Sequence, residues 1–373
     1  MANASPAIRW LAALLVLMLE LACAKHAGSG LRNQHYPTNG SGHLIFYNRI
    51  PKTGSESLAA VLKTAAQQTW GSKHYYGNQF LRDFAFFYRE DVGNNNAKRL
   101  RKFCVYTSKM KRPGVFVLHM SWLNFSAVCS GYPVAANPPM YISMMRDPIS
   151  RQISSTSFVQ TCVCSTDHQK SSGQEWCRPE RDRIRRAGEG RLHAYCQATV
   201  PELLDAALAT ADNETVSSSL LPKLDIANVA TQYFCGFGDR EVTGCRSDIG
   251  SDFAVERAAA HIQSEYAWVG IFELPAESHR MLVHRLPQLF GFKGALQMLD
   301  TTWIVHAGDI HQGDGEERRK VVLGEGLHRR LQVKLRNDYK LYNMVKERIL
   351  AHNVDHPHRE DHSEGGAMPA EEG

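Results

Sequence analysis

The stretch "HLIFYNRIPKTGSESLAAVLKTAAQQ", residues 43–68, decides the fold. Its first half is an apolar run that predicts a buried strand, and its second half places apolar residues at helical spacing. Between them lies a short loop of small and hydroxyl residues that carries a lysine. A strand that turns directly into a helix predicts an anion site, because the first helical turn has free backbone N–H groups and the helix dipole favours negative charge.

Phosphate, or a chemically similar anion, is the expected ligand of this loop. Lys52 adds a positive charge and Gly54 lets the backbone approach closely. Hydroxyl donors are offered by Thr53, Ser55 and Ser57. The alternative is a plain helix cap by Ser55 or Ser57, with Lys52 solvated. The motif G-x-x-x-x-G-K-[ST] is absent, so an ordinary ATPase or GTPase is not expected.

A second polar segment, "YISMMRDPISRQISS", follows another apolar run. Arg146 stands at the end of that predicted strand, and Ser154 comes eight residues later in the following helix. Strand ends of a parallel sheet line one crevice, so Arg146 is placed to fork onto a second phosphate and Ser154 to donate to it. The alternative is a charged turn before a helix.

The rest of the chain alternates between strand and helix patterns. Further strands are predicted at residues 114–123, 138–148 and 268–274, and helices at 149–160, 253–266, 275–291 with a break at Pro287, and 327–350. This alternation predicts an α/β fold with a central parallel sheet that is flanked by helices on both faces. Residues 162–191 are rich in Cys, Arg and Ser without a clean period, and we expect an irregular insertion there.

The ends of the chain differ in composition from its middle. Of the 373 residues, 43% are hydrophobic and 22% are charged, which is typical of a globular protein. Residues 10–24 are apolar apart from Glu20, and they indicate either a cleaved signal peptide or a short signal-anchor behind a cytoplasmic tail, residues 1–9. Residues 25–42 are expected to form a stem, 43–350 the folded domain and 351–373 a disordered tail.

The cysteines fit an oxidising compartment. Cys23 lies in the apolar segment, and the remaining eight of the nine cysteines form an even set. Disulfides are favoured over a zinc site built on "CVC" and Cys177, and no metal is expected. Cys235 and Cys245 are the favoured pair because they would close a short loop. Sequons at Asn39, Asn124 and Asn213 fit a lumenal domain.

The two polar segments together resemble the 5′-phosphosulfate loop and the 3′-phosphate motif of sulfotransferases. The segments "YNRIPKTGS", "KRPGVFVLHMSWLNF", "MYISMMRDPISR", "YFCG", "WVGIFEL" and "YKLYNMVKERI" follow in the order seen in the heparan sulfate/uronyl 2-O-sulfotransferase family. The resemblance covers roughly residues 43–350. It implies a P-loop kinase-like sulfotransferase fold in a single-pass type II Golgi membrane protein, with the catalytic domain in the lumen.

The resemblance also implies a role for each motif residue. It assigns Lys52, Thr53, Gly54, Ser55 and Ser57 to the 5′-phosphosulfate of 3′-phosphoadenosine 5′-phosphosulfate, and Arg146 and Ser154 to its 3′-phosphate. His119, in "LHMSWLNF", falls where the family has its catalytic base, and Lys52 offsets charge on the leaving phosphate. The implied acceptor is the 2-hydroxyl of a uronic acid in an acidic glycosaminoglycan, either heparan sulfate or dermatan/chondroitin sulfate, and no nucleic-acid partner is expected.

Three places depart from the family pattern. Glu56 lies inside the phosphate loop, and we expect its carboxylate to point to solvent. Residues 155–166 lack the family's aromatic and basic stretch, and an Arg cluster follows that is either an acceptor surface or a solvated face. It contains Arg183, Arg185 and Arg186, together with Arg178, Arg181 and Arg191. The loop that covers the nucleotide is not recognisable in residues 311–326.

Two other functions stay open at this point. One is a carbohydrate sulfotransferase of different regiospecificity, and the other is an inactive lumenal glycosaminoglycan-binding protein with the same fold. Lys52, His119 and Arg146 favour an enzyme. A homo-oligomer is also compatible with the resemblance, since family members form trimers, but nothing in the sequence decides the oligomeric state.

Overall fold

Five parallel strands form the sheet on which the chain is built. The computed structural model describes residues 43–77, 96–164, 178–186, 188–212, 228–236, 245, 250–312 and 321–355. The strand order is β2-β3-β1-β4-β5, and every neighbouring pair is parallel. The strands are β1 (Leu44–Asn48), β2 (Tyr75–Tyr76), β3 (Gly114–Leu118), β4 (Met140–Met145) and β5 (Tyr266–Ile271). All residues of β1, β3, β4 and β5 are buried, as continuous apolar strands in a covered parallel sheet should be.

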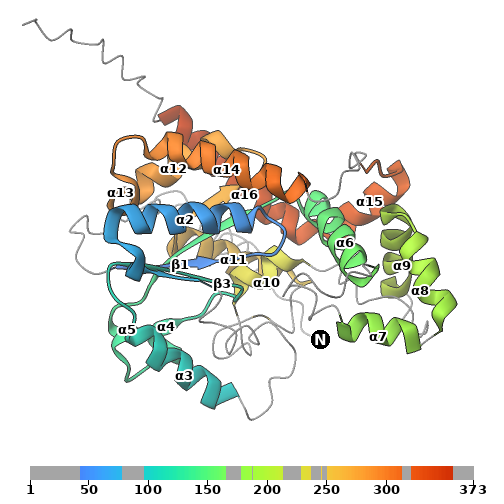
Figure 1. The fold of residues 1–373 in the computed structure, drawn as a ribbon, viewed down its shortest axis with the longest axis horizontal. Helices are drawn as coiled ribbons and strands as arrows, with labels where there is room; N and C mark the ends of the chain where they lie inside the picture. Colours follow the sequence, from blue (N-terminus) through green and yellow to red (C-terminus); the bar gives the residue numbers. More distant parts are fainter. Residues whose placement is uncertain are drawn as a thin grey trace, which may run out of the picture. The chain divides into compact units, whose positions relative to one another are not determined.

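Helices cover both faces of this sheet, which confirms the predicted α/β class. Figure 1 shows α2, α12 and α14 above the sheet and α3, α4 and α5 below it. The helices of the first half are α2 (Ser55–Trp70), α3 (Asn96–Ser108), α4 (Phe125–Val128), α5 (Pro133–Ala136), α6 (Pro148–Cys164), α7 (Arg178–Arg186), α8 (Glu189–Gln197) and α9 (Val200–Asp212). Those of the second half are α10 (Val229–Cys235), α11 (Asp252–Ser264), α12 (Pro275–Arg285), α13 (Pro287–Phe290), α14 (Ala295–Gln312), α15 (Glu325–Lys334) and α16 (Arg336–Asp355). The predicted helix break at Pro287 is confirmed.

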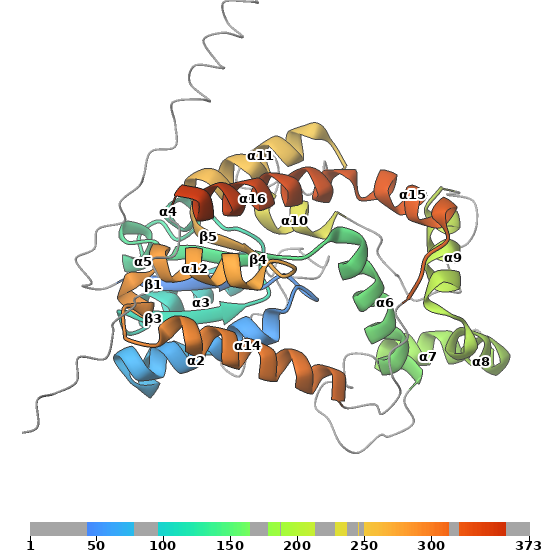
Figure 2. The same cartoon turned by 90° about the horizontal axis from the view of Figure 1, so that it is seen from above.

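A group of helices extends beyond the carboxyl ends of the strands. Figures 1 and 2 both show α6 leaving this edge, with α7 and α8 near its far end and α9 and α15 beside it. These helices bury two small apolar cores. One contains Ile149, Leu204, Ala207, Leu208, Leu331 and Leu335, and the other contains Val163, Ile184, Tyr195 and Leu203. The expectation of an irregular insertion over residues 162–191 is therefore wrong for residues 178–186, which form α7, whereas residues 165–177 lie outside the described residues.

The sequence of α7 explains why this helix was not predicted, and its contacts show what holds it in place. Its sequence, "RPERDRIRR", has one large apolar side chain, Ile184, which is too little for a helical period. Arg181 is buried, and its guanidinium donates from Nε to the carbonyl of Val163 at 2.7 Å and from Nη2 to that of Cys162 at 2.9 Å. Since terminal carbonyls of a helix lack partners within it, this arginine completes the end of α6.

The predicted helix 327–350 is two helices, α15 and α16, which meet at Leu335. The break coincides with a contact between distant segments. Asn228 accepts a hydrogen bond from the backbone N–H of Asp338 at 3.1 Å. The buried Asp338 carboxylate in turn accepts from the N–H groups of Ala230 and Thr231 at 3.0 and 2.8 Å. Each of these polar side chains thus stabilises the first turn of the other's helix, which no local sequence pattern shows.

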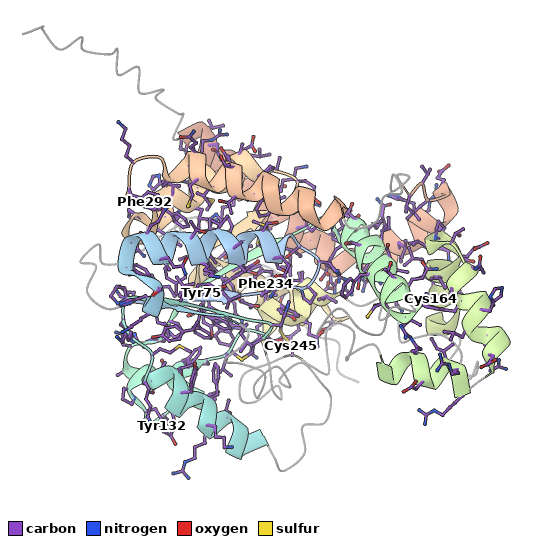
Figure 3. The ribbon with its side chains drawn as sticks, in the orientation of Figure 1. Tyr75, Tyr132, Cys164, Phe234, Cys245 and Phe292 are labelled. Atoms are coloured by element: carbon purple, nitrogen blue, oxygen red, sulfur yellow. A yellow bond between two sulfur atoms is a disulfide. The ribbon has the colours of Figure 1, made fainter. Side chains whose placement is uncertain are left out.

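Disulfides join elements that are separated in sequence. The structure contains Cys104–Cys129, Cys164–Cys196 and the favoured pair Cys235–Cys245, and Cys162 is also disulfide-bonded. Figure 3 shows Cys164 among the helices that extend from the sheet, whereas Cys245 lies below α10. Asn124 directly precedes α4 and caps it, because its side chain accepts a hydrogen bond from the N–H of Ala127. The other two sequons and the apolar run 10–24 lie outside the described residues, and within those residues no helix is both long and apolar enough to span a membrane.

Candidate active site

The predicted site residues follow three neighbouring strands at the carboxyl edge of the sheet. The register places Asn48 of β1 level with Leu118 of β3 and Ser143 of β4. The loop of Lys52 follows β1, His119 follows β3 and Arg146 follows β4. The chain continues from β1 to one side of the sheet and later returns to build β4 and β5 on the other side, so β1 lies at the switch point where α/β sheets bind ligands.

The loop after β1 is held in an unusual backbone conformation. Lys52 and Gly54 both adopt left-handed angles, with φ of 66° and 74°. A Cβ at Gly54 would lie 2.4 Å from a ring carbon of Phe272 and 2.8 Å from one of Trp303. Only glycine fits here, because both the backbone angle and the space exclude a side chain. The rings of Phe272 and Trp303 therefore lie directly against the loop.

The start of α2 is built differently from the helix-cap alternative. Gly54 is the residue before the first helical turn, and no side chain caps this end within the described structure. Ser55 and Ser57 lie buried inside the first turn. Thr53 is also buried, and its hydroxyl donates to the carbonyl of Ile50 at 2.9 Å. The cap by Ser55 or Ser57 is thus wrong, and the first N–H groups of α2 lack a capping side chain, as an anion site requires.

Lys52 and Arg146 come together at this loop. The guanidinium Nη1 of Arg146 is 3.4 Å from the backbone carbonyl of Lys52. The ammonium of Lys52 lies 3.2 Å from the centre of the Phe158 ring on α6, a cation–π contact. Phe158 is one helical turn beyond Ser154, so both lie on the same side of α6. The loop, the end of β4 and the first half of α6 therefore surround one cationic region.

Arg146 is a half-buried cation whose ion pair with Glu273 is long. Burial lowers the pKa of its guanidinium, although Glu273 and Asp147 act in the opposite direction. The contact between its Nε and the Glu273 carboxylate is long, at 3.9 Å, and that carboxylate also accepts a hydrogen bond from the N–H of Asp147. Its guanidinium carbon lies 4.8 Å from the centre of the Phe272 ring. An arginine held in this way suits an anionic ligand.

His119 is oriented by a backbone carbonyl. Its Nδ1 lies 2.6 Å from the carbonyl oxygen of Arg49. A carbonyl only accepts, so Nδ1 carries the proton and Nε2 keeps its lone pair in the neutral ring. Burial, followed by the positive charges of Arg49 and Lys52, lowers the pKa of His119 to about 4. The imidazole is therefore neutral at pH 7, with the acceptor nitrogen away from the carbonyl.

Arg49 is a site residue that the sequence analysis did not select. Its side chain is only 4% exposed, and it forms an ion pair with Glu56, whose side chain is 64% exposed. Burial lowers the pKa of Arg49, and the hydroxyls of Tyr47, Tyr75 and Tyr233 are the other groups that act on it. The Glu56 side chain is exposed to solvent, as expected, but its carboxylate also pairs with Arg49, which was not expected. The sequence shows only an acidic residue seven positions after an arginine. This spacing predicts no contact unless the turn between the two residues is known.

The Arg cluster lies at the far end of α6 from this region. Arg185 and Arg186 are exposed on α7, Arg183 is partly exposed, and Arg181 is buried as described above. From Ser154 to Cys164, α6 rises by about 15 Å at about 1.5 Å per residue. The structure thus separates the cationic region at the sheet edge from the arginines of α7, and α6 connects the two. Within the described residues no cluster of metal-ligating side chains is present.

Comparison with known proteins identifies relatives over most of the chain, although no family model matches it. The chain is 25% identical over 308 residues to uronyl 2-sulfotransferase of Mus musculus, covering 82% of this chain and 62% of that protein. It is 20% identical over 310 residues to the uronyl 2-sulfotransferase homolog pip of Drosophila melanogaster, covering 82% of this chain and 52% of that protein. It is 23% identical over 282 residues to heparan sulfate 2-O-sulfotransferase 1 of Gallus gallus, covering 74% of this chain and 64% of that protein.

The chain spans about 62% of the length of the uronyl 2-sulfotransferase of Mus musculus. Relatives of both kinds, uronyl and heparan sulfate 2-O-sulfotransferases, match the same large part of the chain. The resemblance to this family that the sequence motifs indicated is thereby confirmed.

Proposed function

From this resemblance and the carboxyl-edge site, we propose that the chain is a polysaccharide sulfotransferase. It moves the sulfo group of 3′-phosphoadenosine 5′-phosphosulfate to the 2-hydroxyl of a uronic acid in a glycosaminoglycan. The observation that carries the proposal is the meeting of Lys52, His119 and Arg146 at the ends of three adjacent strands. Relatives named as 2-O-sulfotransferases of uronyl groups and heparan sulfate support the reaction class.

The donor nucleotide binds at the loop and at Arg146. The N–H groups at the start of α2 and the Lys52 ammonium hold the 5′-phosphosulfate, with the hydroxyls of Ser55 and Ser57 close by. The Thr53 hydroxyl already donates to a carbonyl, so this residue contributes through its backbone. Arg146 and Ser154 hold the 3′-phosphate. Lys52 leaves the Phe158 ring to reach the anion, since a full charge binds an ammonium more strongly than an aromatic face.

His119 removes the acceptor proton. The lone pair of Nε2 takes the proton of the sugar hydroxyl while that oxygen forms its bond to sulfur. The bond from sulfur to the 5′-phosphate oxygen breaks, and the electron pair stays on that oxygen, where Lys52 offsets the charge. A pKa of about 4 describes the protein without nucleotide. The negative charge of the bound donor opposes the effect of Arg49 and Lys52, and it brings the pKa of His119 closer to the value that suits a base at neutral pH.

The acceptor chain extends along α6 to the arginines of α7. Arg183, Arg185 and Arg186 supply positive charge for a polyanion, at a distance that only an extended ligand spans. The acceptor is heparan sulfate or dermatan/chondroitin sulfate. The disulfides and the sequon at Asn124 suit a domain in the Golgi lumen, with residues 10–24 as membrane anchor.

The test is sulfo transfer by the full-length protein followed by disaccharide analysis. Heparan, dermatan and chondroitin chains that lack 2-O-sulfate are each incubated with labelled donor, and His119→Ala serves as control. We expect the label on the 2-position of uronic acid in one polymer. Label on a hexosamine would show a carbohydrate sulfotransferase of other regiospecificity. No transfer, together with no binding of adenosine 3′,5′-bisphosphate, would show a glycosaminoglycan-binding protein that lacks the activity.

A further inference from the structure

Glu56 occupies a position in the phosphate loop where a negative charge opposes the binding of phosphate. Its carboxylate is nevertheless engaged, because it forms an ion pair with Nη2 of Arg49. The two partners differ strongly in exposure, with Glu56 at the surface of the first turn of α2 and Arg49 almost fully buried. A buried guanidinium that lost this carboxylate would keep its desolvation cost and lose its only acidic partner within the described residues.

Arg49 connects this ion pair to the base. Its backbone carbonyl accepts the hydrogen bond from His119 Nδ1, so the position of Arg49 sets the direction of the imidazole. Its backbone N–H donates to the carbonyl of Leu118 at 3.0 Å, directly before His119. The backbone of Arg49 is therefore tied to Leu118 through its N–H and to the imidazole through its carbonyl, and Glu56 holds the far end of its side chain.

Among the described residues, two positive charges act on His119. Arg49 and Lys52 act on it directly, and both oppose its protonation. The residues that act on Arg49 from the surrounding elements are three tyrosines, Tyr47 on β1, Tyr75 on β2 and Tyr233 on α10, together with the ion-paired Glu56 on α2. Glu56 is thus the anionic partner that balances the positive charge beside His119.

We propose that Glu56 is a positioning residue for the transfer reaction: its carboxylate holds Arg49 in place and offsets its charge, and through Arg49 it orients His119 and maintains its basicity. This inference rests on the proposed function. It assigns a role to a residue that otherwise only weakens an anion site. Glu56 has two opposite effects. Its negative charge increases the basicity of His119, and it weakens the binding of the nucleotide phosphates.

The expected effects of Glu56→Gln follow from the sign of the lost charge. An anion near an imidazole stabilises its protonated form, so loss of the carboxylate lowers the pKa of His119, by roughly half a unit for one nearby exposed charge. The acid limb of the rate profile then moves to lower pH. The weaker and less firmly oriented base lowers kcat on the order of tenfold. Nucleotide affinity is unchanged or higher, because a negative charge has left the loop.

Three measurements are made on the full-length protein and on Glu56→Gln. They are calorimetric binding of adenosine 3′,5′-bisphosphate, the pH profile of single-turnover sulfo transfer, and the NMR titration of the His119 ring, identified by its loss in His119→Gln. Glu325→Gln is the matched control. Glu325 also lies in the first turn of a helix and pairs with an arginine, Arg329, but both residues of this pair are exposed and belong to α15.

Lower kcat, an acid limb moved to lower pH and retained nucleotide affinity would support the role, with Glu325→Gln showing none of these changes. Parent values of kcat and of the His119 pKa in Glu56→Gln would overturn it, and so would a loss of nucleotide affinity at an unchanged acid limb. The NMR titration distinguishes a failure of the role proposed for Glu56 from a failure of the proposed sulfotransferase function. If the protein transfers no sulfo group to any acceptor, a lowered His119 pKa in Glu56→Gln still supports the link, and an unchanged one refutes it.

Discussion

The carboxyl edge of the sheet and the helices beyond it are built on different principles. At the edge, a short loop between β1 and α2 carries its chemistry in consecutive residues, and its shape follows from Gly54 and from the strand that precedes it. Beyond the edge, α6 to α9 and α15 are joined by small apolar cores, by the Cys164–Cys196 disulfide and by the buried Arg181. The chemistry of the first region is readable in the sequence because the loop carries it in consecutive residues. The second region could not be predicted, because it is held together only by contacts between distant residues.

Apart from loss of the base itself, the largest effect is expected at the edge, for Lys52→Ala. The ammonium contacts phosphate in the ground state and offsets more charge in the transition state, so its loss should lower both nucleotide affinity and kcat. A fall in kcat of about two orders of magnitude or more is the usual scale for such electrostatic groups. Single-turnover transfer at saturating donor and calorimetry measure the two parts. Arg146→Ala should act mainly through affinity, because the 3′-phosphate does not react, and an equal loss of kcat in that variant would contradict the assignment.

Gly54→Ala should show how rigid the loop is. A methyl group there would overlap with Phe272 and Trp303, and the alanine would have to adopt a backbone φ of 74°. We expect a loss of about 1–3 kcal/mol in unfolding free energy, together with weaker nucleotide binding. Gly190→Ala in α8 is the matched control, because a Cβ there meets nothing within 4 Å, and it should be neutral or stabilising by up to about 1 kcal/mol. Chemical denaturation measures both, and equal values would contradict the account.

The arginines of α7 should differ in their contribution to stability. Arg181→Ala removes two hydrogen bonds to the carbonyls that end α6, so we expect a loss of about 1–3 kcal/mol in unfolding free energy. Replacing Arg183, Arg185 and Arg186 by Ala should leave stability nearly unchanged, because these side chains are wholly or partly exposed.

The same triple replacement should raise the acceptor KM and reduce the dependence of that KM on salt, with nucleotide affinity unchanged. The comparison of thermal stability with acceptor kinetics in the two variants checks this division. Acceptor kinetics that stay at the parent values in the triple variant would show that the arginines of α7 are only a solvated surface.

How much of the fold can be predicted from the sequence depends on how far apart in the chain the contacting residues lie. The apolar runs gave β1, β3, β4 and β5, since a strand that is buried on both faces must be apolar throughout. The break between α15 and α16 was missed because it depends on Asn228, which lies more than 100 positions away in the chain and pairs with Asp338. The helix α7 was missed because one apolar residue, Ile184, leaves no period to detect.

The candidate site shows the same division. Lys52, Gly54 and Arg146 follow from strand ends and a loop motif, and the structure brings them together. Arg49 was missed because a charged residue at the end of a strand gives no sign of burial. The partnership of Arg49 with Glu56 requires the left-handed turn at Lys52 and Gly54, which brings the first turn of α2 back toward the end of β1.

The central claim is that His119 is the base of a transfer reaction at the edge of the sheet, and His119→Ala tests it most directly. Single-turnover sulfo transfer and calorimetric binding of adenosine 3′,5′-bisphosphate are measured side by side for the parent and the variant. Because the imidazole serves the acceptor and not the nucleotide, the account predicts parent nucleotide affinity and a transfer rate lower by roughly two to four orders of magnitude. Transfer at close to the parent rate would show that another group removes the proton, and it would refute the assignment.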